Sequence, residues 1–399
     1  MKNCKLVIIG GGILGTTIAR EAAINKLFSE IFIIEKESVL GAHSSTRNSG
    51  VIHAGFYYYP ESFKAKFCAE GNKIMREYCL KNSISINKCG KVVVSSNELE
   101  EKVLFELYKR GIANGSELQI LDKTKLVKYE TYAKTYQNFL WSPNTWSASP
   151  QDLFKSLIDE CKELGIKFIT NELIVKVNKN ELISLKGNIY KYDHVINSAG
   201  GYSLEVAELF GIKKDFKILP FKGLYLKSIK KVESFQRHIY PVPDIQQPFL
   251  GIHTTLTSDN YLKLGPTAIP VFSPENYKLF EGLDWKISAD IFKLQLNLFL
   301  KNKFGFRDLA FREIKYLIKN NILKEANKLT SLDLNKIDFN WHSPGIRPQL
   351  YNCKTQKLEN DFILFKKEKS THILNSISPA WTCSFKTAKY IIEEIKSQL

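Results

Sequence analysis

Three glycines near the amino terminus have the spacing that binds a diphosphate. Gly10, Gly12 and Gly15 follow a short apolar run at residues 5–9 and precede a helical pattern. In a strand–turn–helix unit, the first glycine permits a tight turn, the second lets phosphate oxygens approach the backbone, and the third lets the helix pack closely on the strand. Backbone N–H groups at the start of the helix then face the anion. The segment predicts a phosphate-binding turn.

A carboxylate after the next apolar run indicates what carries the diphosphate. Residues 31–34 form a second predicted strand, and Glu35 follows it, twenty residues beyond Gly15. At this distance a carboxylate accepts hydrogen bonds from ribose hydroxyls and disfavours a 2′-phosphate. The two features together predict a dinucleotide with an unphosphorylated adenosine ribose, which leaves FAD and NAD as alternatives.

A hydroxyl-rich block at residues 41–58 agrees with a flavin. Ser44, Ser45 and Thr46 offer hydroxyl groups suited to ribityl and pyrophosphate oxygens. Arg47 can neutralise a phosphate, and the alternative for this side chain is a surface ion pair with a neighbouring acid.

This block, with residues 60–68, resembles the L-2-hydroxyglutarate dehydrogenase/oxidase family, within the FAD-dependent D-amino-acid-oxidase-like superfamily. The similar stretches continue in the same order along nearly the whole chain. One difference is that Ser45-Thr46-Arg47 stands where better-known dehydrogenases of the family often have Thr-Gly-His, and another branch of the family is closer to this sequence. The further similar stretches are residues 89–91, 197–201, 220–223, 239–243, 249–254, 264–266, 345–348 and 378–380.

The resemblance implies that the chain binds FAD through residues from both of its ends. In the family fold, the helix that begins near Pro379 faces the flavin pyrimidine, where the positive end of a helix dipole suits the negative charge of the reduced ring. The predicted contacts with FAD are Gly10, Gly12, Ile13, Leu14, Gly15, Glu35, Lys36, Ser44, Ser45, Arg47, Asn48, Ser49, Val175, Ala199, Gly200, Gly345, Arg347, Pro379 and Ala380.

The resemblance also implies oxidation of a small 2-hydroxy acid, which needs a base for the hydroxyl proton and a cation for the carboxylate. His53 is the first candidate for the base because it follows the flavin-proximal loop and imidazole titrates near neutral pH. His253 is the rival, and either histidine could instead be structural. Arg347 is the predicted carboxylate clamp, since a guanidinium makes two parallel hydrogen bonds. The other predicted substrate contacts are Tyr58, Lys222 and Tyr240.

The order of elements predicts an α/β protein in which two domains share the chain. A Rossmann-like, discontinuous FAD-binding domain is expected over residues 1–88, 147–219 and 340–399, because the motif at 345–348 and the last helix return to it. A second, antiparallel-sheet α+β domain that binds substrate is expected over residues 89–146 and 220–339. Among the predicted elements are helices at 62–81, 99–110 and 150–165, and strands at 166–170, 173–177, 182–185 and 189–196.

Composition narrows the setting and the partners. Seven cysteines without a C-x-x-C pair predict neither a disulfide framework nor a zinc site, and we expect no metal. A reducing, cytoplasmic location follows, with peripheral contact at the inner face of the membrane as an open alternative. The net charge of +16 is spread along the chain, so we expect a small anionic substrate and no nucleic acid.

Three alternative functions stay open at this point. The first is an amine or amino-acid oxidase of the same superfamily, since the same hydride geometry applies to a C–N bond. The second is a basic nucleic-acid-binding flavoprotein, which the +16 charge would suit. The third is a nicotinamide-dependent dehydrogenase that shares only the glycine turn. The sequence leaves the electron acceptor open among oxygen, a quinone and an electron-transfer protein.

Overall fold

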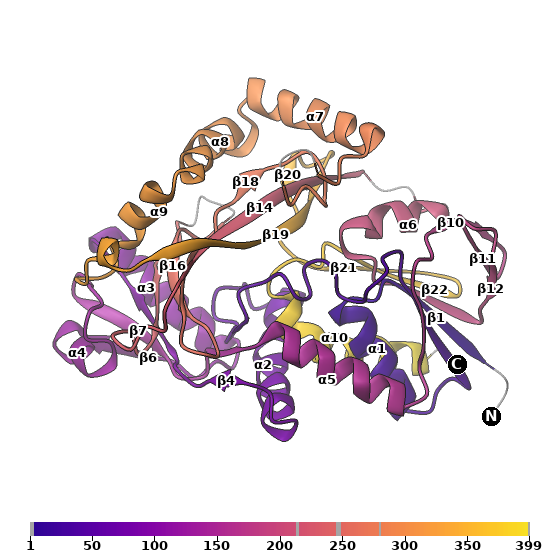
Figure 1. Ribbon diagram of the computed structural model, residues 1–399, viewed down its shortest axis with the longest axis horizontal. Helices are drawn as coiled ribbons and strands as arrows, with labels where there is room; N and C mark the ends of the chain where they lie inside the picture. Colours follow the sequence, from indigo (N-terminus) through magenta and orange to yellow (C-terminus); the bar gives the residue numbers. More distant parts are fainter. Residues whose placement is uncertain (1–3, 213–214, 245–248, 279–280, 398–399) are drawn as a thin grey trace.

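The computed structural model describes residues 4–212, 215–244, 249–278 and 281–397, and its two largest sheets occupy different ends of the molecule (Figure 1). Each sheet combines segments that are far apart in the sequence. Two smaller, three-stranded sheets lie beside them.

The six-stranded sheet contains the amino-terminal strand and is mainly parallel. Its order is β21-β22-β13-β1-β2-β9, and β21 is antiparallel to its neighbour. Leu6 and Ile8 of β1 pack against the helices on one face, whereas Val7 and Ile9 pack toward the small sheet on the other. Burial on both faces explains why this strand is apolar throughout. The strands are β1 (Lys5–Ile9), β2 (Glu30–Ile34), β9 (Lys167–Ile169), β13 (His194–Asn197), β21 (Ile363–Lys367) and β22 (Ser370–Leu374).

Helices and a small sheet cover the two faces of the six-stranded sheet. The helical face carries α1 (Ile13–Ile24), α2 (Phe63–Lys81), α5 (Pro150–Glu163) and α10 (Ala380–Lys396), whose apolar side chains share one core. The other face carries α6 (Ser203–Leu209) and the sheet β10 (Ile174–Asn178), β11 (Glu181–Ser184) and β12 (Ile189–Lys191).

The ten-stranded sheet is mostly antiparallel and is built around two long strands. These are β14 (Phe216–Ser228) and β19 (Phe339–Asn352), which pair along almost their whole lengths. The other strands are β5 (Lys91–Val94), β6 (Gln119–Asp122), β7 (Asn138–Ser142), β15 (His238–Pro241), β16 (His253–Leu256), β17 (Leu262–Gly265), β18 (Ile269–Pro270) and β20 (Lys357–Leu358). A small sheet of β3 (Val51–Ile52), β8 (Trp146–Ala148) and β4 (Ile86–Asn87) completes the strands.

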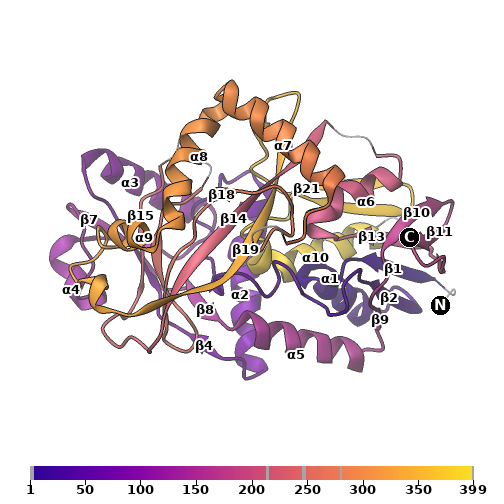
Figure 2. The ribbon, with the colours of Figure 1, turned by 45° about the horizontal axis from the view of Figure 1, so that its top comes forward.

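The helices associated with the ten-stranded sheet lie toward the outside of the molecule. Figure 1 shows α7, α8 and α9 together along one edge, and Figure 2 shows α3 and α4 at the end away from α1. Their bounds are α3 (Glu98–Ala113), α4 (Leu126–Tyr129), α7 (Trp285–Leu300), α8 (Phe306–Ile314) and α9 (Lys319–Ala326). The 3₁₀ turns are η1 (Lys123–Lys125), η2 (Gly200–Tyr202), η3 (Lys303–Gly305), η4 (Lys315–Leu317) and η5 (Leu334–Lys336). Among the described residues, no helix has both the length and the apolar character needed to cross a bilayer.

The predicted elements are largely confirmed, and α5 shows why the local signals were informative. The Ser149 hydroxyl accepts a hydrogen bond from the Asp152 amide at 3.2 Å, Pro150 occupies the first helical position, and Gly165 follows the helix with φ +78°. The predicted strand 189–196 is two strands, because the chain leaves β12 and enters a different sheet at β13.

The end of the predicted substrate domain also differs from the structure. Residues 340–352, which we assigned to the FAD-binding part, continue β19 in the ten-stranded sheet. We assigned the 345–348 motif to that part because we expected it to return there together with the last helix. Here Pro348 lies opposite Pro220 within the long ladder, so the strand continues through the motif.

Candidate active site

A cavity of about 720 Å³ lies where the two large sheets approach each other, a size typical of ligand sites. It extends from the glycine turn after β1 to the strands β16 and β19. The predicted residues that line it are Gly10, Gly12, Ile13, Leu14, Glu35, Lys36, Ser44, Ser45, Arg47, Asn48, Ser49, His53, Tyr58, Ala199, Gly200, Tyr240, His253, Gly345, Arg347, Pro379 and Ala380.

The glycine turn has no room for side chains. Gly10 has φ +107°, and a Cβ there would lie 2.6 Å from the Ser198 carbonyl oxygen. A Cβ on Gly12 would lie 2.9 Å from Ser45 Oγ. Gly15 does not line the cavity, and its Cβ would fall 2.1 Å from the Gly10 carbonyl oxygen. Gly15 therefore acts through close packing of α1 on the turn.

The start of α1 carries unpaired donors that fit a diphosphate. Its N-cap, Gly12, supplies no side-chain cap. The Ile13 amide donates to Ser45 Oγ at 2.8 Å, but the amides of Gly12 and Leu14 find no acceptor among the described residues. Helix N-termini with free amides bind anions through hydrogen bonds and the helix dipole. The turn can therefore hold the pyrophosphate of FAD.

Glu35 is positioned by the backbone to receive a ribose. Its Oε2 accepts a hydrogen bond from the Gly11 amide at 2.7 Å, and its Oε1 accepts one from the Glu37 amide at 2.9 Å. The side chain is buried but lines the cavity. Each carboxylate oxygen has a second lone pair, so both can still accept from ribose hydroxyls.

The hydroxyl-rich loop is tied to the long strand β19. Ser44 Oγ donates to the Ile346 carbonyl at 3.2 Å, and a Cβ on Gly345 would lie 2.3 Å from the Arg47 carbonyl oxygen. Arg47 donates from Nε to the Ala42 carbonyl at 2.9 Å, and its guanidinium lies 4.4 Å from the Tyr277 ring centre. The two predicted motifs thus meet in space, although about 300 residues separate them.

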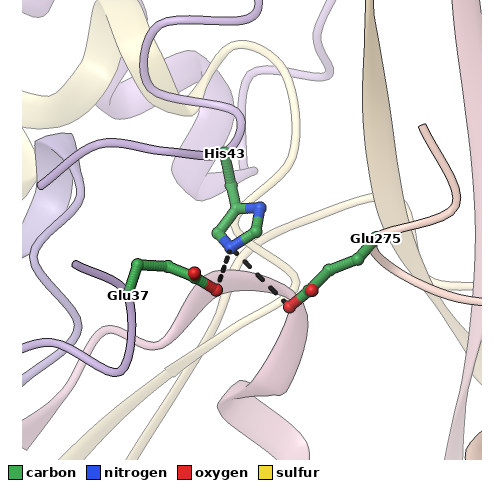
Figure 3. A group of neighbouring side chains, drawn as sticks. All are labelled: Glu37, His43 and Glu275. Atoms are coloured by element: carbon green, nitrogen blue, oxygen red, sulfur yellow. Dashed lines mark hydrogen bonds and ion pairs between the residues drawn. The ribbon is translucent and has the colours of Figure 1, made fainter. Parts of the chain in front are cut away.

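An ionic cluster lies at the rim of the dinucleotide end (Figure 3). His43 Nε2 lies 3.1 Å from Glu37 Oε1 and 3.7 Å from Glu275 Oε1, while its Nδ1 lies 2.9 Å from the Tyr277 hydroxyl. The side chains of Glu37, His43 and Glu275 are close enough together to hold a metal ion. The Lys36 ammonium, however, hydrogen-bonds both carboxylates. The lysine already compensates their charge, so the cluster joins the loop after β2 to the segment around Glu275.

Besides Gly15, two predicted contacts lie outside the cavity. Val175 is 40% exposed, and its neighbour Ile174 lines the cavity instead. Lys222 is next to Phe221, whose direct partner across the sheet is Arg347. Successive residues of a strand point to opposite faces, so Lys222 faces away from Arg347. In both strands the sequence identified the segment but not which face each residue occupies.

His253 has a defined tautomer at the other end of the cavity. Its Nδ1 lies 2.8 Å from the Gly251 carbonyl oxygen, which can only accept, so Nδ1 carries the proton and Nε2 has a free lone pair. The ring stacks on Tyr240 with centres 3.8 Å apart. Burial, with nearby Lys91, lowers the pKa of His253 to about 3, so the imidazole is neutral.

His53 lines the same cavity but is less constrained. Its backbone amide donates to Thr382 Oγ1 at 3.1 Å, and its carbonyl accepts from Asn72 Nδ2 at 3.1 Å. The imidazole has no hydrogen-bond partner in the described ranges. Burial, and then the Lys91 charge, lower the pKa of His53 to about 3.

Arg347 presents a half-buried guanidinium to the cavity. Its Nη1 donates to the Thr267 carbonyl at 3.0 Å, which leaves other N–H groups for a ligand. A Cβ on Gly223 would lie 3.5 Å from both Nη atoms, an ordinary van der Waals contact, so the guanidinium lies directly over this glycine. Burial lowers the pKa of Arg347, but arginine stays charged in proteins.

Sequence reasoning missed three cations near the site. Lys91 is fully buried, and its ammonium lies 4.4–4.6 Å from the ring centres of Phe56, Tyr57 and Tyr240. Lys64 and Arg110 both line the cavity. The available signal was the lysine directly before the apolar run Val92–Val94, because a strand that is otherwise buried leaves a charge little access to water.

Comparison with known proteins assigns this chain to a family of FAD-dependent enzymes. The family profile "FAD dependent oxidoreductase" (DAO) matches residues 5–393. The chain is 30% identical to the mitochondrial L-2-hydroxyglutarate dehydrogenase of Homo sapiens, over 98% of this chain and 89% of that protein. It is also 30% identical to L-2-hydroxyglutarate dehydrogenase of Escherichia coli K12, over 98% and 93% of the two chains.

Solved structures of the same fold include two oxidases. L-α-glycerophosphate oxidase of Mycoplasma pneumoniae, solved with FAD bound, aligns with a TM-score of 0.73 and 21% identity over 99% of this chain and 95% of that chain. Glycine oxidase of Geobacillus kaustophilus aligns with a TM-score of 0.74 and 16% identity over 99% and 95%. At these identities the likeness establishes the fold.

Proposed function

The chain belongs to the DAO family of FAD-dependent oxidoreductases, and we propose that it oxidises a small 2-hydroxy acid, L-2-hydroxyglutarate, to the 2-oxo acid. The observation that carries the proposal is one cavity that holds a half-buried guanidinium and a neutral imidazole with a free Nε2. The names of the relatives at about 30% identity support this substrate.

The cofactor contacts that we propose follow from the donors and acceptors described above. The amides at the start of α1 and the hydroxyl of Ser45 bind the pyrophosphate, and Glu35 binds the adenosine ribose. Ala380 and the following amides of α10 present a helix N-terminus to the isoalloxazine end. Bound FAD would accept the hydride from C2 of the substrate.

We propose that Arg347 binds the C1 carboxylate and that His253 accepts the hydroxyl proton at Nε2. Tyr240 positions His253 by stacking, and the Gly251 carbonyl keeps the proton on Nδ1. The pKa of His253 is low while its charged neighbours are all cations, namely Lys91 and Arg347. A dicarboxylate brings two negative charges, which raise the basicity of the imidazole when the substrate binds. His53 is the second candidate for the base because it lines the same cavity.

We further propose that Lys64 or Arg110 binds the second carboxylate. Both line the cavity beside Tyr58 and Tyr59. The reaction also needs an electron acceptor, which is oxygen, a quinone or an electron-transfer protein. We propose that the protein is located in the cytoplasm, since its seven free thiols suit a reducing compartment.

Anaerobic titration of the FAD-loaded protein tests the proposal. L-2-Hydroxyglutarate should bleach the flavin absorbance stoichiometrically and produce 2-oxoglutarate, whereas the D enantiomer should not. Matched titrations with glycine and L-proline test the amino-acid oxidase alternative. Bleaching by an amino acid but not by 2-hydroxyglutarate would refute the proposed substrate and leave the fold assignment intact.

A further inference from the structure

We propose that one face of the ten-stranded sheet, next to the cavity, carries a second anion site that binds a small oxyanion with two negative charges. Its ligands are the side chains of Lys227 in β14, Lys263 in β17 and His342 in β19. These three residues, which we call the cation cluster, do not line the cavity. The inference does not rest on the proposed function, because it concerns the binding of an anion and not the reaction.

The pairing of three neighbouring strands brings the cation cluster together. In the sheet, β14 lies between β17 and β19. Lys227 is directly opposite Lys263 on one side, and Tyr225 is directly opposite His342 on the other. Directly opposite residues point to the same face of a sheet, and so do residues two apart in one strand. Lys227, Lys263 and His342 therefore share one face with Tyr225.

The opposite face of the same strands supplies their hydrophobic packing. Leu226, Leu262 and Leu264 alternate with the residues of the cation cluster and are fully buried. They share a core with Ile322 and Leu323 of α9. The packing that holds these strands in the fold therefore does not involve the cation cluster.

Lys263 is buried without an acceptor for its ammonium group. The residue is 6% exposed, and its Nζ has no hydrogen bond or ion pair within residues 4–212, 215–244, 249–278 and 281–397. The charge of Asp259 acts on Lys263, but Asp259 is exposed and accepts a hydrogen bond from Thr257. A charged group that is buried without a partner destabilises a fold, so such a group indicates a functional site. The Nζ atom still reaches solvent, so an anion can approach it.

The neighbours of Lys263 add positive charge. Like charges directly opposite each other in a sheet are destabilising, and Lys227 has no ion-pair partner in the described part of the chain. Burial and the charges of Lys263 and Lys227 lower the pKa of His342 to about 4, so its imidazole is neutral at pH 7 and offers one N–H donor. Two ammonium groups and an N–H donor match an oxyanion with two negative charges, which would remove the repulsion.

The cation cluster adjoins the cavity along all three strands. Tyr225, Pro266 and Gly345 line the cavity, and each lies two or three residues along the chain from a member of the cation cluster. The Lys263 ammonium lies 5.8 Å from the ring centre of Tyr225. The second anion site is therefore distinct from the cavity but shares part of its wall.

Thermal unfolding of the FAD-loaded protein at pH 7.5 tests the inference with two anions, inorganic phosphate and 2-oxoglutarate. A ligand that binds only the folded protein stabilises it in proportion to the logarithm of its concentration. At least one of the two anions should raise the melting temperature more than sodium chloride does at the same ionic strength. Lys263→Met should weaken this binding about tenfold or more, the loss expected for one hydrogen bond between charged groups.

Two further variants complete the comparison. Lys217→Met is the matched control, because Lys217 is exposed and lies on the same strand as Lys227. This control removes the same charge and should respond to both anions like the wild type. Lys227→Met replaces a half-buried side chain and should weaken binding as Lys263→Met does, which keeps the test valid if Lys263→Met fails to fold.

The NMR signal of the His342 imidazole, assigned by its loss in His342→Gln, locates the bound anion. The signal should shift on titration in the wild type and in Lys217→Met, but about tenfold more anion should be needed in Lys263→Met. A shift with phosphate alone would identify a phosphate site, and a shift with 2-oxoglutarate would identify a dicarboxylate site.

Three results would overturn the inference. In the first, neither anion stabilises the wild type more than it stabilises the folded lysine variants of the cation cluster. In the second, sodium chloride has the same effect as both anions. In the third, the His342 signal does not move with either anion. Neither readout involves flavin reduction, so failure of the proposed reaction with L-2-hydroxyglutarate would leave both unchanged.

Discussion

Replacing Lys91 by methionine should stabilise the protein while changing the pH dependence of its reaction. Lys91 is fully buried, and desolvation lowers its pKa from 10.5 to about 7. At about 1.4 kcal/mol for each pKa unit, holding this ammonium in the fold costs about 5 kcal/mol below pH 7. The three rings around it return about 0.5–1 kcal/mol each. Lys91→Met should therefore raise the free energy of unfolding by about 2–3 kcal/mol at pH 6.

The stability difference between Lys91→Met and the wild type depends on pH between 7 and 10.5. Between pH 7 and 10.5 the folded lysine has released its proton, whereas the unfolded lysine keeps it. The wild type therefore gains stability as the pH rises through this window, by at most about 1.4 kcal/mol per pH unit. The advantage of Lys91→Met should be complete at pH 6 and lost by pH 9.5.

Denaturant unfolding of the FAD-loaded proteins at pH 6, 8 and 9.5 measures both effects. Lys263→Met is a matched control, because burial lowers the pKa of Lys263 to about 8 and this residue does not line the cavity. The control should also gain stability, yet keep the wild-type pH profile of kcat/KM. Lys91→Met should shift the acid limb of that profile to higher pH, since the Lys91 charge lowers the pKa of both His53 and His253. A variant that is less stable than the wild type at pH 6, or whose advantage persists at pH 9.5, would refute this reasoning.

Four further predictions concern the site and the fold. Arg347→Lys should lower kcat/KM for L-2-hydroxyglutarate about a hundredfold, because a lysine cannot replace a bidentate clamp, and steady-state kinetics with unchanged flavin content would measure it. His253→Gln should lower kcat about 10²–10⁴-fold. In the wild type, the pH profile of kcat/KM should show no ionisation near pH 6.5, because the pKa of His253 is about 3. An inflection of the profile at pH 6.5 would contradict the assignment of His253 as the base. The free energy of unfolding should also fall as the pH drops from 6.5 toward 3, because His53 and His253 stay neutral in the fold but are protonated in the unfolded chain. Denaturant unfolding at pH 5 and pH 7 would detect this fall. Gly15→Ala should abolish flavin retention, since its Cβ would lie 2.1 Å from the Gly10 carbonyl oxygen; a yellow, stable variant would argue against the packing role.

Local rules predicted the conformation of the glycine turn and the position of the carboxylate beside it. The turn at Gly10 and Gly12 and the carboxylate at Glu35 depend on strand–turn–helix geometry, which a short segment determines almost alone. The start of α5, with its Ser149 N-cap and Pro150, could be predicted for the same reason. The structure adds the contacts that the segment makes with distant residues such as Ser45 and Ser198.

The features that the sequence left open depend on long-range packing. The faces of Val175 and Lys222 depend on strand phase, which the neighbouring strands determine. The burial of Lys91 results from three aromatic rings that come from two different segments. On α7, the periodicity does not separate the buried Leu294 and Leu298 from the exposed Leu296, because apolar residues at helical spacing all look like core positions in a linear sequence.

The cavity is assembled from both ends of the polypeptide, which has a consequence for biosynthesis. Its walls include residues of the glycine turn after β1 and of Pro379 and Ala380, where the last helix begins. A ribosome-bound chain can therefore form β1 and α1 early, but the binding site becomes complete only after α10 has left the exit tunnel. Flavin should consequently be acquired only after α10 has emerged, and fragments that end before residue 380 should be colourless even where their first sheet is formed.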